Sequence, residues 1–252
     1  MQWNPDCYHQ FQKERFAPFE DLLRLVAVRP GLDAIDLGCG TGELTKRLAD
    51  ALPESNVLGI DNSQEMLQKA EAVAGPNLRF ELKSIEAVSG QWDLVWSHAA
   101  LQWVDDHSAL IPRLFALLKS GGQIAVQLPS NHNHISHATL REIAMEPQFR
   151  DSFGGWMRKS PVLQIDQYGE LLYRSGGSEI TVFEKAYAHV LESSEAVLNW
   201  LRGTALLPYL ERLPESLRPD FLAECSRRFK VIWPETPVFY PFRRILFSAR
   251  KP

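Results

Sequence analysis

Cysteine is scarce in this 252-residue sequence, which holds only Cys7, Cys39 and Cys225. An odd number of widely spaced cysteines is typical neither of a disulfide framework nor of a metal cluster, and it suits a reducing compartment. The sequence also lacks the basic start and apolar core of a signal peptide, and no apolar run approaches the roughly 20 residues that a membrane helix needs. We therefore expect a cytoplasmic protein with no membrane partner.

Clustered positive charge is also missing. Lys and Arg total 27 against 31 Asp and Glu, the formal net charge is −4, and no run of Lys or Arg exceeds two residues. Proteins that hold nucleic acid through its phosphates usually present a basic face, so we expect no nucleic-acid partner. The composition, 45% hydrophobic and 23% charged, is that of an ordinary globular protein.

Short apolar strands and amphipathic helices alternate through the first half of the chain. Because each parallel crossover must be covered, this order predicts an α/β fold, with a parallel sheet between helices and a ligand crevice beyond the carboxyl ends of the strands. A turn at Gly121-Gly122 is expected to lead into the fifth strand. The expected strands cover residues 33–37, 56–60, 78–82, 92–96 and 123–128, with a helix at 41–52 after the first.

After residue 130 the pattern changes to polar and helical segments with isolated strands at 179–183 and 238–249. We expect a single domain over residues 1–252. Within it, residues 1–30 form an N-terminal cap helix that ends at Pro30-Gly31, and residues 131–175 and 193–235 form helical lid elements over the active site.

The clearest motif is Asp36-Leu-Gly38-Cys-Gly40-Thr-Gly42, which follows a predicted strand and precedes a predicted helix. Glycine there permits positive φ and lets the backbone approach a ligand closely. The spacing is not the G-x-G-x-x-G of a dinucleotide-binding turn, and no Lys-Ser/Thr follows as in a phosphate-cradling loop. Asp36 suits a ligand with positive charge and disfavours phosphates. The alternative is a tight strand–helix turn without a ligand.

Asp61 ends the second predicted strand, where an acid accepts hydrogen bonds from both hydroxyls of a ribose. Ser63 is better placed than Asp61 to cap the helix that follows. Ser84-Ile85, after the third strand, is expected to lie against an adenine. Ser97-His98, at the end of the fourth strand, is expected to border the tail of the same ligand.

With these residues the chain resembles the class I S-adenosylmethionine-dependent methyltransferases, and more narrowly the trans-aconitate 2-methyltransferases. Segments similar to the narrower family span nearly the whole chain: Trp3-Asn-Pro5, Tyr8, Glu14-Arg15, Leu101-Gln-Trp103, Asp106-His107, Ala125-Val-Gln-Leu-Pro129, Asn131, Trp200, Thr204 to Leu210, Arg244 and Ala249-Arg250. The resemblance implies a Rossmann-like sheet of seven strands, the last antiparallel, with a helical lid.

The resemblance also implies S-adenosyl-L-methionine as cofactor and S-adenosyl-L-homocysteine as product. Arg15, on the N-terminal helix, is either a partner of the cofactor's carboxylate or a solvated helix charge. The residues expected to bind the cofactor are Tyr8, Arg15, Asp36, Gly38, Cys39, Gly40, Asp61, Asn62, Met66, Ser84, Ile85 and Ser97.

The reaction that the resemblance implies is methyl transfer to a carboxylate oxygen of a small organic acid similar to trans-aconitate. A carboxylate is already ionised at neutral pH, so this reaction needs no general base. It does need cations, and Arg202 and Arg244 are the expected carboxylate ligands, with Arg243 as a weaker candidate and Trp103 lining the pocket.

Three positions depart from the pattern of the family. Leu207 stands where it commonly has Arg, Ser130 where it has Asp, and His98 where it has Asn. Another small acid, or a neutral metabolite methylated on oxygen or carbon with His98 as base, therefore stays open as the acceptor. A non-catalytic S-adenosylmethionine-binding protein is an alternative from another class, and the glycine spacing opposes a nicotinamide oxidoreductase.

Other chemistry-bearing residues have simpler interpretations. His132, His134 and His137 are spaced like metal ligands, but no nearby Cys or acid pair completes a zinc site, and we expect no metal. A polar loop leading into a capped helix accounts for them. The tryptophans at 92, 96 and 200 are expected in the core, as is Trp103 unless it lines the substrate pocket.

Overall fold

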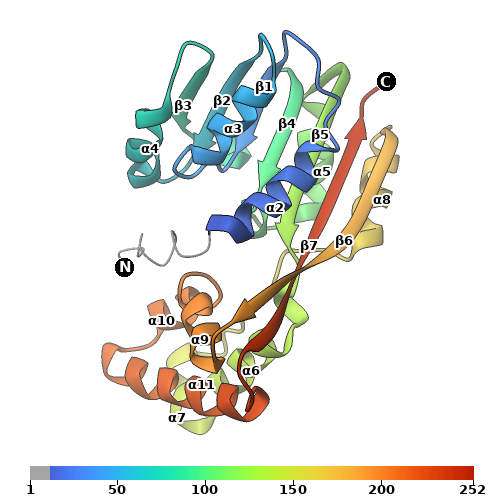
Figure 1. Cartoon of the computed structure of the whole chain (residues 1–252). Helices are drawn as coiled ribbons and strands as arrows, with labels where there is room; N and C mark the ends of the chain where they lie inside the picture. The colour runs from blue at the N-terminus through green and yellow to red at the C-terminus, as the bar shows by residue number, and fades with distance from the viewer. Residues whose placement is uncertain (1–11) are drawn as a thin grey trace. The chain divides into compact units, whose positions relative to one another are not determined.

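The strands expected from the sequence form one sheet, whose order is β3-β2-β1-β4-β5-β7-β6 in the computed structural model, which describes residues 12–252 (Figure 1). Strands β1 to β5 run parallel, and β7 is antiparallel to β5. This confirms the predicted seven-stranded Rossmann-like sheet. The strand bounds are β1 Asp33–Leu37, β2 Asn56–Asp61, β3 Leu78–Leu82, β4 Trp92–His98, β5 Leu118–Pro129, β6 Ser178–Leu191 and β7 Val238–Arg250.

The described chain divides into two compact units. The first, here called the sheet unit, comprises residues 16–129, 161–185 and 244–252. The second, here called the helical unit, comprises the described residues 12–15, 130–160 and 186–243. Strands β6 and β7 each contribute residues to both units.

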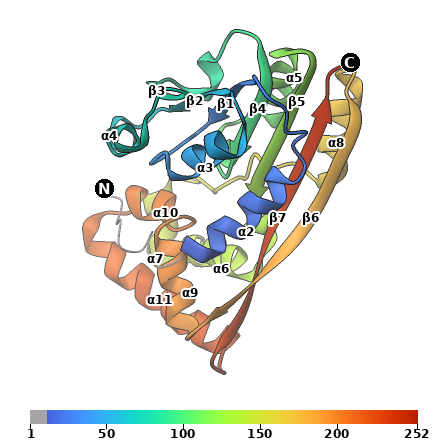
Figure 2. The ribbon, with the colours of Figure 1, turned by 45° about the horizontal axis from the view of Figure 1, so that its top comes forward.

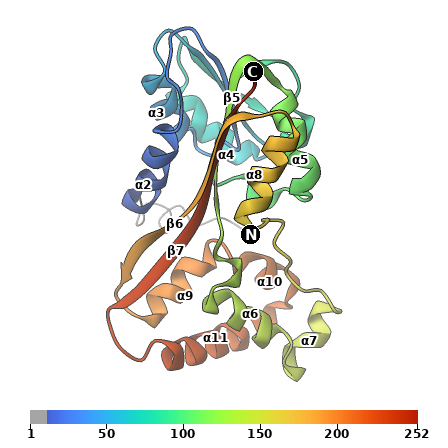
Figure 3. The same ribbon diagram turned by 90° about the vertical axis from the view of Figure 1, so that its right-hand side faces the viewer.

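Helices cover both faces of the sheet unit. In the side view α2 and α3 lie on one side of the strands and α5 and α8 on the other (Figure 3), and α2 and α3 are in front of the strands in Figure 2. The helix bounds are α2 Gln12–Leu23, α3 Glu43–Ala51, α4 Gln64–Ala70, α5 His107–Ala116 and α8 Ile165–Arg174.

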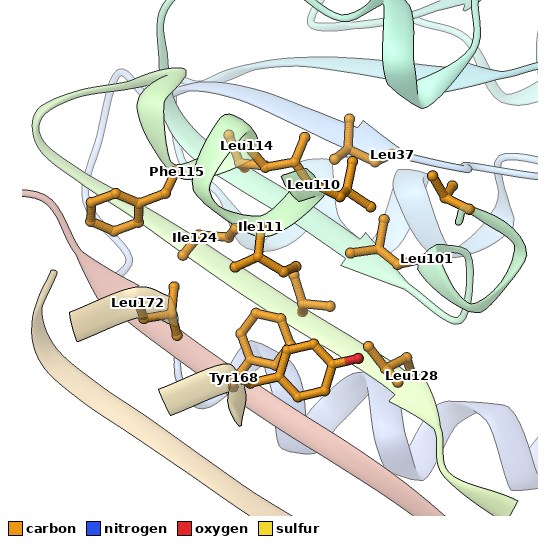
Figure 4. Packing of buried hydrophobic residues seen from close by; sticks show 14 of the residues in the cluster. Leu37, Leu101, Leu110, Ile111, Leu114, Phe115, Ile124, Leu128, Tyr168 and Leu172 are labelled. Atoms are coloured by element: carbon orange, nitrogen blue, oxygen red, sulfur yellow. The ribbon is translucent and has the colours of Figure 1, made fainter. Parts of the chain in front are cut away.

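The alternation of side chains along each strand determines which helices it contacts. Ala34 and Ala125 pack with Leu22 of α2 and Leu48 of α3, whereas Ile124 packs in a separate cluster with α5 and α8. In Figure 4, Leu110, Ile111 and Leu114 of α5 lie between β5 and the helix α8 that carries Tyr168 and Leu172. Burial of these two apolar faces stabilises the sheet at roughly 25 cal/mol per Å² of apolar surface.

Two of the boundaries that differ from the sequence prediction do so because of contacts between residues distant in the chain. The predicted turn at Gly121-Gly122 was wrong: β5 begins at Leu118 and passes through both glycines, with a register shift against β4. The N-terminal helix ends at Leu23 rather than at Pro30-Gly31, since the side chain of Gln123 bonds the backbone of residues 25 and 27 and holds them outside the helix.

Helices of the helical unit pack around an aromatic core. Phe221 of α11 meets Phe149 of α7 edge-on at 5.2 Å between ring centroids and stacks on Tyr209 of α10 at 5.9 Å. Helix α11 also packs against α6 and α9. The bounds are α6 Ile135–Ala144, α7 Pro147–Phe153, α9 Ser194–Arg202, α10 Leu207–Arg212 and α11 Arg218–Ile232.

The expected lid segments correspond only in part to this unit. Residues 165–174 of the first segment form α8, which belongs to the sheet unit and packs on its core. That the remaining helices cover the active site stays a prediction. In the described part of the chain no helix has the combination of length and apolarity that crossing a membrane requires.

A buried chain of hydrogen bonds joins α5 to α8 on the sheet. The Leu163 N–H donates to the Tyr168 hydroxyl oxygen (3.2 Å), and His107 bonds both that hydroxyl (2.5 Å) and the Leu101 carbonyl (2.9 Å). A carbonyl only accepts, so Nε2 of His107 carries the proton and Nδ1 accepts from Tyr168. Burial lowers the pKa of His107, consistent with this neutral tautomer.

Replacing Tyr168 with Phe should therefore destabilise the fold by about 1–3 kcal/mol, because Nδ1 of His107 would remain buried without a donor. Urea unfolding measures the loss. The matched control is Tyr173→Phe on the same helix, where the side chain is 74% exposed and no change is expected. Equal stability of the two variants would contradict the hydrogen-bond chain.

Candidate active site

The glycine turn between β1 and α3 adopts the backbone conformation that the motif predicts. Gly38, Gly40 and Gly42 have φ of 80°, 57° and 75°, values that favour glycine. A Cβ on Gly38 would lie 2.2 Å from the Cβ of Ala100, and one on Gly42 would lie 2.7 Å from the ring of Phe80. A Cβ on Gly40 would meet nothing within 4 Å. The turn is therefore packed at both ends and open at its middle glycine.

Asp36, at the start of the motif, is a buried carboxyl with one bound oxygen. Thr45 of α3 donates its hydroxyl to Oδ2 at 2.6 Å, while Oδ1 is buried without a partner among the described residues. Burial, opposed by the Thr45 bond and aided by the charge of Asp61, raises the pKa of Asp36 from 3.8 to about 7. Sequence reasoning missed Thr45, because nothing local marks a helix threonine as the partner of a strand residue.

Asp61 connects the ends of β1 and β2. Its Oδ2 accepts a hydrogen bond from the Gly40 N–H and its Oδ1 accepts one from the Ser63 N–H, both at 2.9 Å. Ser63 caps α4 by accepting from the N–H of Met66, as predicted. Asp61 therefore positions the glycine turn, a role that its place at a strand end did not reveal. Asn62 is exposed and Met66 half-buried on this side of the sheet.

The side chain of Cys39 packs inward with Leu67, Ala70 and Phe80. Burial raises the pKa of its thiol far above the ordinary range. Its backbone N–H donates to the Ile60 carbonyl and its carbonyl accepts from Gly42. Cys39 therefore shapes the turn, with its thiol directed into the core.

The short helix at Ile85–Ala87 lies beside the glycine turn. The Cδ1 atom of Ile85 would be 4.0 Å from a Cβ on Gly38, so the third loop and the motif come together as expected. Arg113 of α5 holds this loop by donating to the carbonyls of Ile85 (2.6 Å) and Val88 (3.2 Å). Ser84, half-buried, precedes it. No local pattern marks Arg113 as a residue that holds this loop.

The end of β4 lies against the same turn. The Ser97 hydroxyl donates to the Leu37 carbonyl at 3.0 Å, so this side chain connects the two central strands. His98 is half-buried, with its ring edge-on to Phe19 of α2 at 6.0 Å between centroids. Ala99 then takes the left-handed conformation, φ 57°, and brings Ala100 against Gly38. A non-glycine residue in that region carries backbone strain.

The residues expected to bind the acceptor differ in burial. Arg244 is 5% exposed and lies opposite Pro129 at the junction of β5 and β7. Arg202, in the last turn of α9, and Arg243 are exposed. Trp103, in the short helix Leu101–Trp103, is 55% exposed, so its placement in the core was wrong, whereas Trp96 is fully buried.

The segment that holds His132, His134 and His137 has a structural role. His134 caps α6 by accepting from the Ser136 N–H, which confirms the capped-helix interpretation of the histidine segment. Among the residues that the structure describes, no group of His, Cys, Asp and Glu could hold a metal ion. Tyr8 lies outside the described residues, as does the side chain of Arg15.

The raised pKa of Asp36 predicts a pH-dependent stability. A carboxyl with a raised folded-state pKa stabilises the fold while protonated, and that contribution is lost as pH rises from about 4 to about 7. The shift from 3.8 to about 7 corresponds to about 4 kcal/mol. In the ligand-free protein, Asp36→Asn should match the wild type at pH 4 and exceed its unfolding free energy at pH 8. The exposed Asp50→Asn is the control, and a pH-independent difference for Asp36→Asn would contradict the shift.

Comparison with known proteins agrees with this geometry. A family model described as a methyltransferase domain matches residues 34–122. Solved structures of similar fold include the YcgJ protein of Bacillus subtilis, with a TM-score of 0.62 and 12% identity over 94% of this chain and 99% of that one. Another is phosphoethanolamine N-methyltransferase 2 of Haemonchus contortus, with a TM-score of 0.56 and 17% identity over 96% of this chain and 53% of that one.

Two curated relatives are similar along most or all of their length. The trans-aconitate 2-methyltransferase of Deinococcus radiodurans is 45% identical over 258 aligned residues, which cover all of this chain and 99% of the relative. That of Variovorax paradoxus is 37% identical over 93% of this chain and 91% of the relative. The chain therefore belongs to the trans-aconitate 2-methyltransferase family of class I S-adenosylmethionine-dependent methyltransferases.

Proposed function

We propose that this enzyme methylates a carboxylate oxygen of trans-aconitate, giving the methyl ester and S-adenosyl-L-homocysteine. The observation that carries the proposal is the buried Arg244, at the junction of β5 and β7 in the same unit as the glycine turn. The planar fork of its guanidinium matches the two oxygens of a carboxylate. The curated relatives of this chain are named for the same reaction.

The residues around the glycine turn fit S-adenosylmethionine, which supplies an activated methyl group on a cationic sulfur. Asp36 has a buried oxygen without a partner in the described chain, and Gly40 leaves open space where a side chain would stand. Each carboxylate oxygen of Asp61 accepts one backbone bond and keeps capacity for another, which suits ribose hydroxyls. Two acids here complement a cationic ligand and would repel a phosphate.

We assign the remaining cofactor contacts from the places of the residues at the ends of the strands. We assign the adenine to Ile85 and Ser84, and the methionine portion to the ends of β1 and β4 at Gly38 and Ser97. The Ser97 hydroxyl already donates to the Leu37 carbonyl. Ser97 would therefore support the shape of the loop beside the cofactor, and its oxygen could still accept a hydrogen bond. Asn62, Met66, Tyr8 and Arg15 stay proposed contacts.

The reaction asks the protein for placement and charge rather than for proton transfer. The ordinary pKa of a carboxyl group is near 4, so the acceptor oxygen is already an anion at neutral pH. A cationic donor and an anionic acceptor cancel charge as they react, which favours a site from which water is excluded. Holding the reacting atoms in line can contribute several kcal/mol. In this mechanism His98 shapes the pocket and moves no proton.

Binding of a tricarboxylate distributes its charge over several cations. Arg244 would hold a carboxylate through two parallel hydrogen bonds, each charge-assisted. Trp103 is proposed as an apolar wall of the acceptor pocket, and a role for Arg202 as a second cation stays a prediction from the sequence. That the helices at residues 131–160 and 193–235 act as a lid stays a prediction from the sequence.

A methyl-transfer assay with radiolabelled S-adenosylmethionine tests the proposal. The panel should hold trans-aconitate, other di- and tricarboxylates, and neutral alcohols and phenols. We expect transfer to trans-aconitate, with the label released as methanol by alkali because the product is an ester. Transfer to neutral acceptors alone, or an alkali-stable product, would overturn carboxylate methylation.

Removing the cation should weaken acid binding specifically. Arg244→Gln is expected to raise the KM for trans-aconitate about tenfold to a hundredfold, the value of one or two charge-assisted bonds, with Lys restoring part of the loss. The control is the exposed neighbour in Arg243→Gln. Binding of S-adenosylhomocysteine, measured by calorimetry, reports correct folding. An unchanged KM in a folded Arg244→Gln variant would exclude Arg244 from the acceptor site.

A further inference from the structure

Two glutamines on β5 occupy equivalent positions but differ in their partners. Gln123 and Gln127 are 7% and 0% exposed and lie four residues apart, so the strand alternation places both on the face of Ala125. The amide of Gln123 is saturated: its oxygen accepts from Ala27 at 2.9 Å and its nitrogen donates to Leu25 at 2.6 Å. Neither end of the Gln127 amide has a partner within the described residues.

Such an amide requires a physical explanation. Buried polar groups in native proteins are nearly always hydrogen-bonded, because an unpaired one loses its water without compensation. A methionine of similar shape would fill the position of Gln127 without that cost. The retained amide therefore indicates a polar partner that arrives from outside the fold.

The neighbours of Gln127 identify the place of that partner. Gln127 lies directly opposite His98 on β4 and opposite Leu246 on β7. Leu246 shares the cluster of Ala125, and the alternation of β7 puts Arg244 on this same face. His98 meets Phe19, which also packs on Trp96 of that face. The side chains of Gln127, His98 and Arg244 thus lie together at the carboxyl ends of β4 and β5. Arg244 is the first residue of β7 that belongs to the sheet unit.

The strand order separates this cluster from the nucleoside end of the site. In the order β2-β1-β4-β5, Asp61 ends β2 and the glycine turn follows β1. Gln127 lies on β5, on the far side of β4 from both. A ligand of Gln127 would therefore be the methyl acceptor, because the ribose is assigned to Asp61 at the opposite end of this row.

We propose that Gln127 is a specificity-determining residue for the methyl acceptor, donating from Nε2 to a carboxylate oxygen of the acid that Arg244 binds. This inference rests on the proposed function and deepens it. A neutral amide recognises a carboxylate by direction and adds no charge, so it selects the position of a second oxygen beside the arginine fork. Its own oxygen accepts from a bound water or from a hydroxyl of the ligand.

Paired substitutions to methionine on one strand test the inference. Gln127→Met should raise the KM for trans-aconitate tenfold or more, keep kcat and the affinity for S-adenosylhomocysteine within about twofold, and leave Tm equal or higher. Gln123→Met should do the reverse, lowering Tm with the acid KM nearly unchanged, because it breaks two internal bonds. Gln127→Glu should weaken acid binding further, since it adds a negative charge beside the substrate.

The outcomes separate this inference from the function on which it rests. Normal wild-type transfer with an unchanged acid KM in Gln127→Met would overturn the inference alone, as would a fall in Tm equal to that of Gln123→Met. A change in the KM for S-adenosylmethionine instead of the acid would assign Gln127 to the cofactor and also overturn it. No wild-type transfer to any acid would overturn the proposed function, and the inference with it.

Discussion

The close packing of Gly38 against Ala100 is the constraint on which the rest of the site depends. The two Cβ positions would lie 2.2 Å apart, so the turn after β1 and the loop after β4 can meet only because position 38 has no side chain. Asp61 fixes the other side of the turn through the Gly40 N–H. Backbone groups of three strands are thereby held in one arrangement, and the left-handed residue Ala99 is tolerated because its surroundings determine it.

The strand order then places acidic side chains at one end of the carboxyl edge of the sheet and an arginine at the other. Asp36 and Asp61 lie at the ends of β1 and β2, and Arg244 lies beyond β5. A cationic donor and an anionic acceptor would each meet the opposite charge, with the end of β4 between them. The chemistry needs little more than this, which explains why a carboxylate methyltransferase can work without a base.

The sequence predicted well what depends on local pattern. The bounds of β1 and β3 are as expected, the three motif glycines have positive φ, and Ser63 caps α4, because strand alternation, glycine conformation and capping are short-range properties. The sequence prediction failed where contacts between residues distant in the chain determine the structure. The course of β5 through Gly121-Gly122 depends on pairing with β4.

Hydrogen-bond partners that come from other helices could not be predicted from the sequence either. Thr45 and Arg113 bond residues of the site from helices, and no spacing in the sequence marks either as a partner. For Gln127 a signal did exist: a polar residue interrupts the apolar run Ile124 to Leu128. Burial alone does not distinguish Gln127 from Gln123. The two differ only in the folded chain, where the amide of Gln123 is hydrogen-bonded and that of Gln127 is not.

In the proposed arrangement, the methyl donor and the acceptor occupy opposite ends of one row of strand ends. The most direct measurement is the pair of Michaelis constants, for S-adenosylmethionine and for trans-aconitate, in Asp61→Asn and Arg244→Gln. We expect a crossed result, in which Asp61→Asn raises mainly the constant for the cofactor and Arg244→Gln raises mainly the constant for the acid. If both variants raised the same constant, the assignment of the two ends would be contradicted.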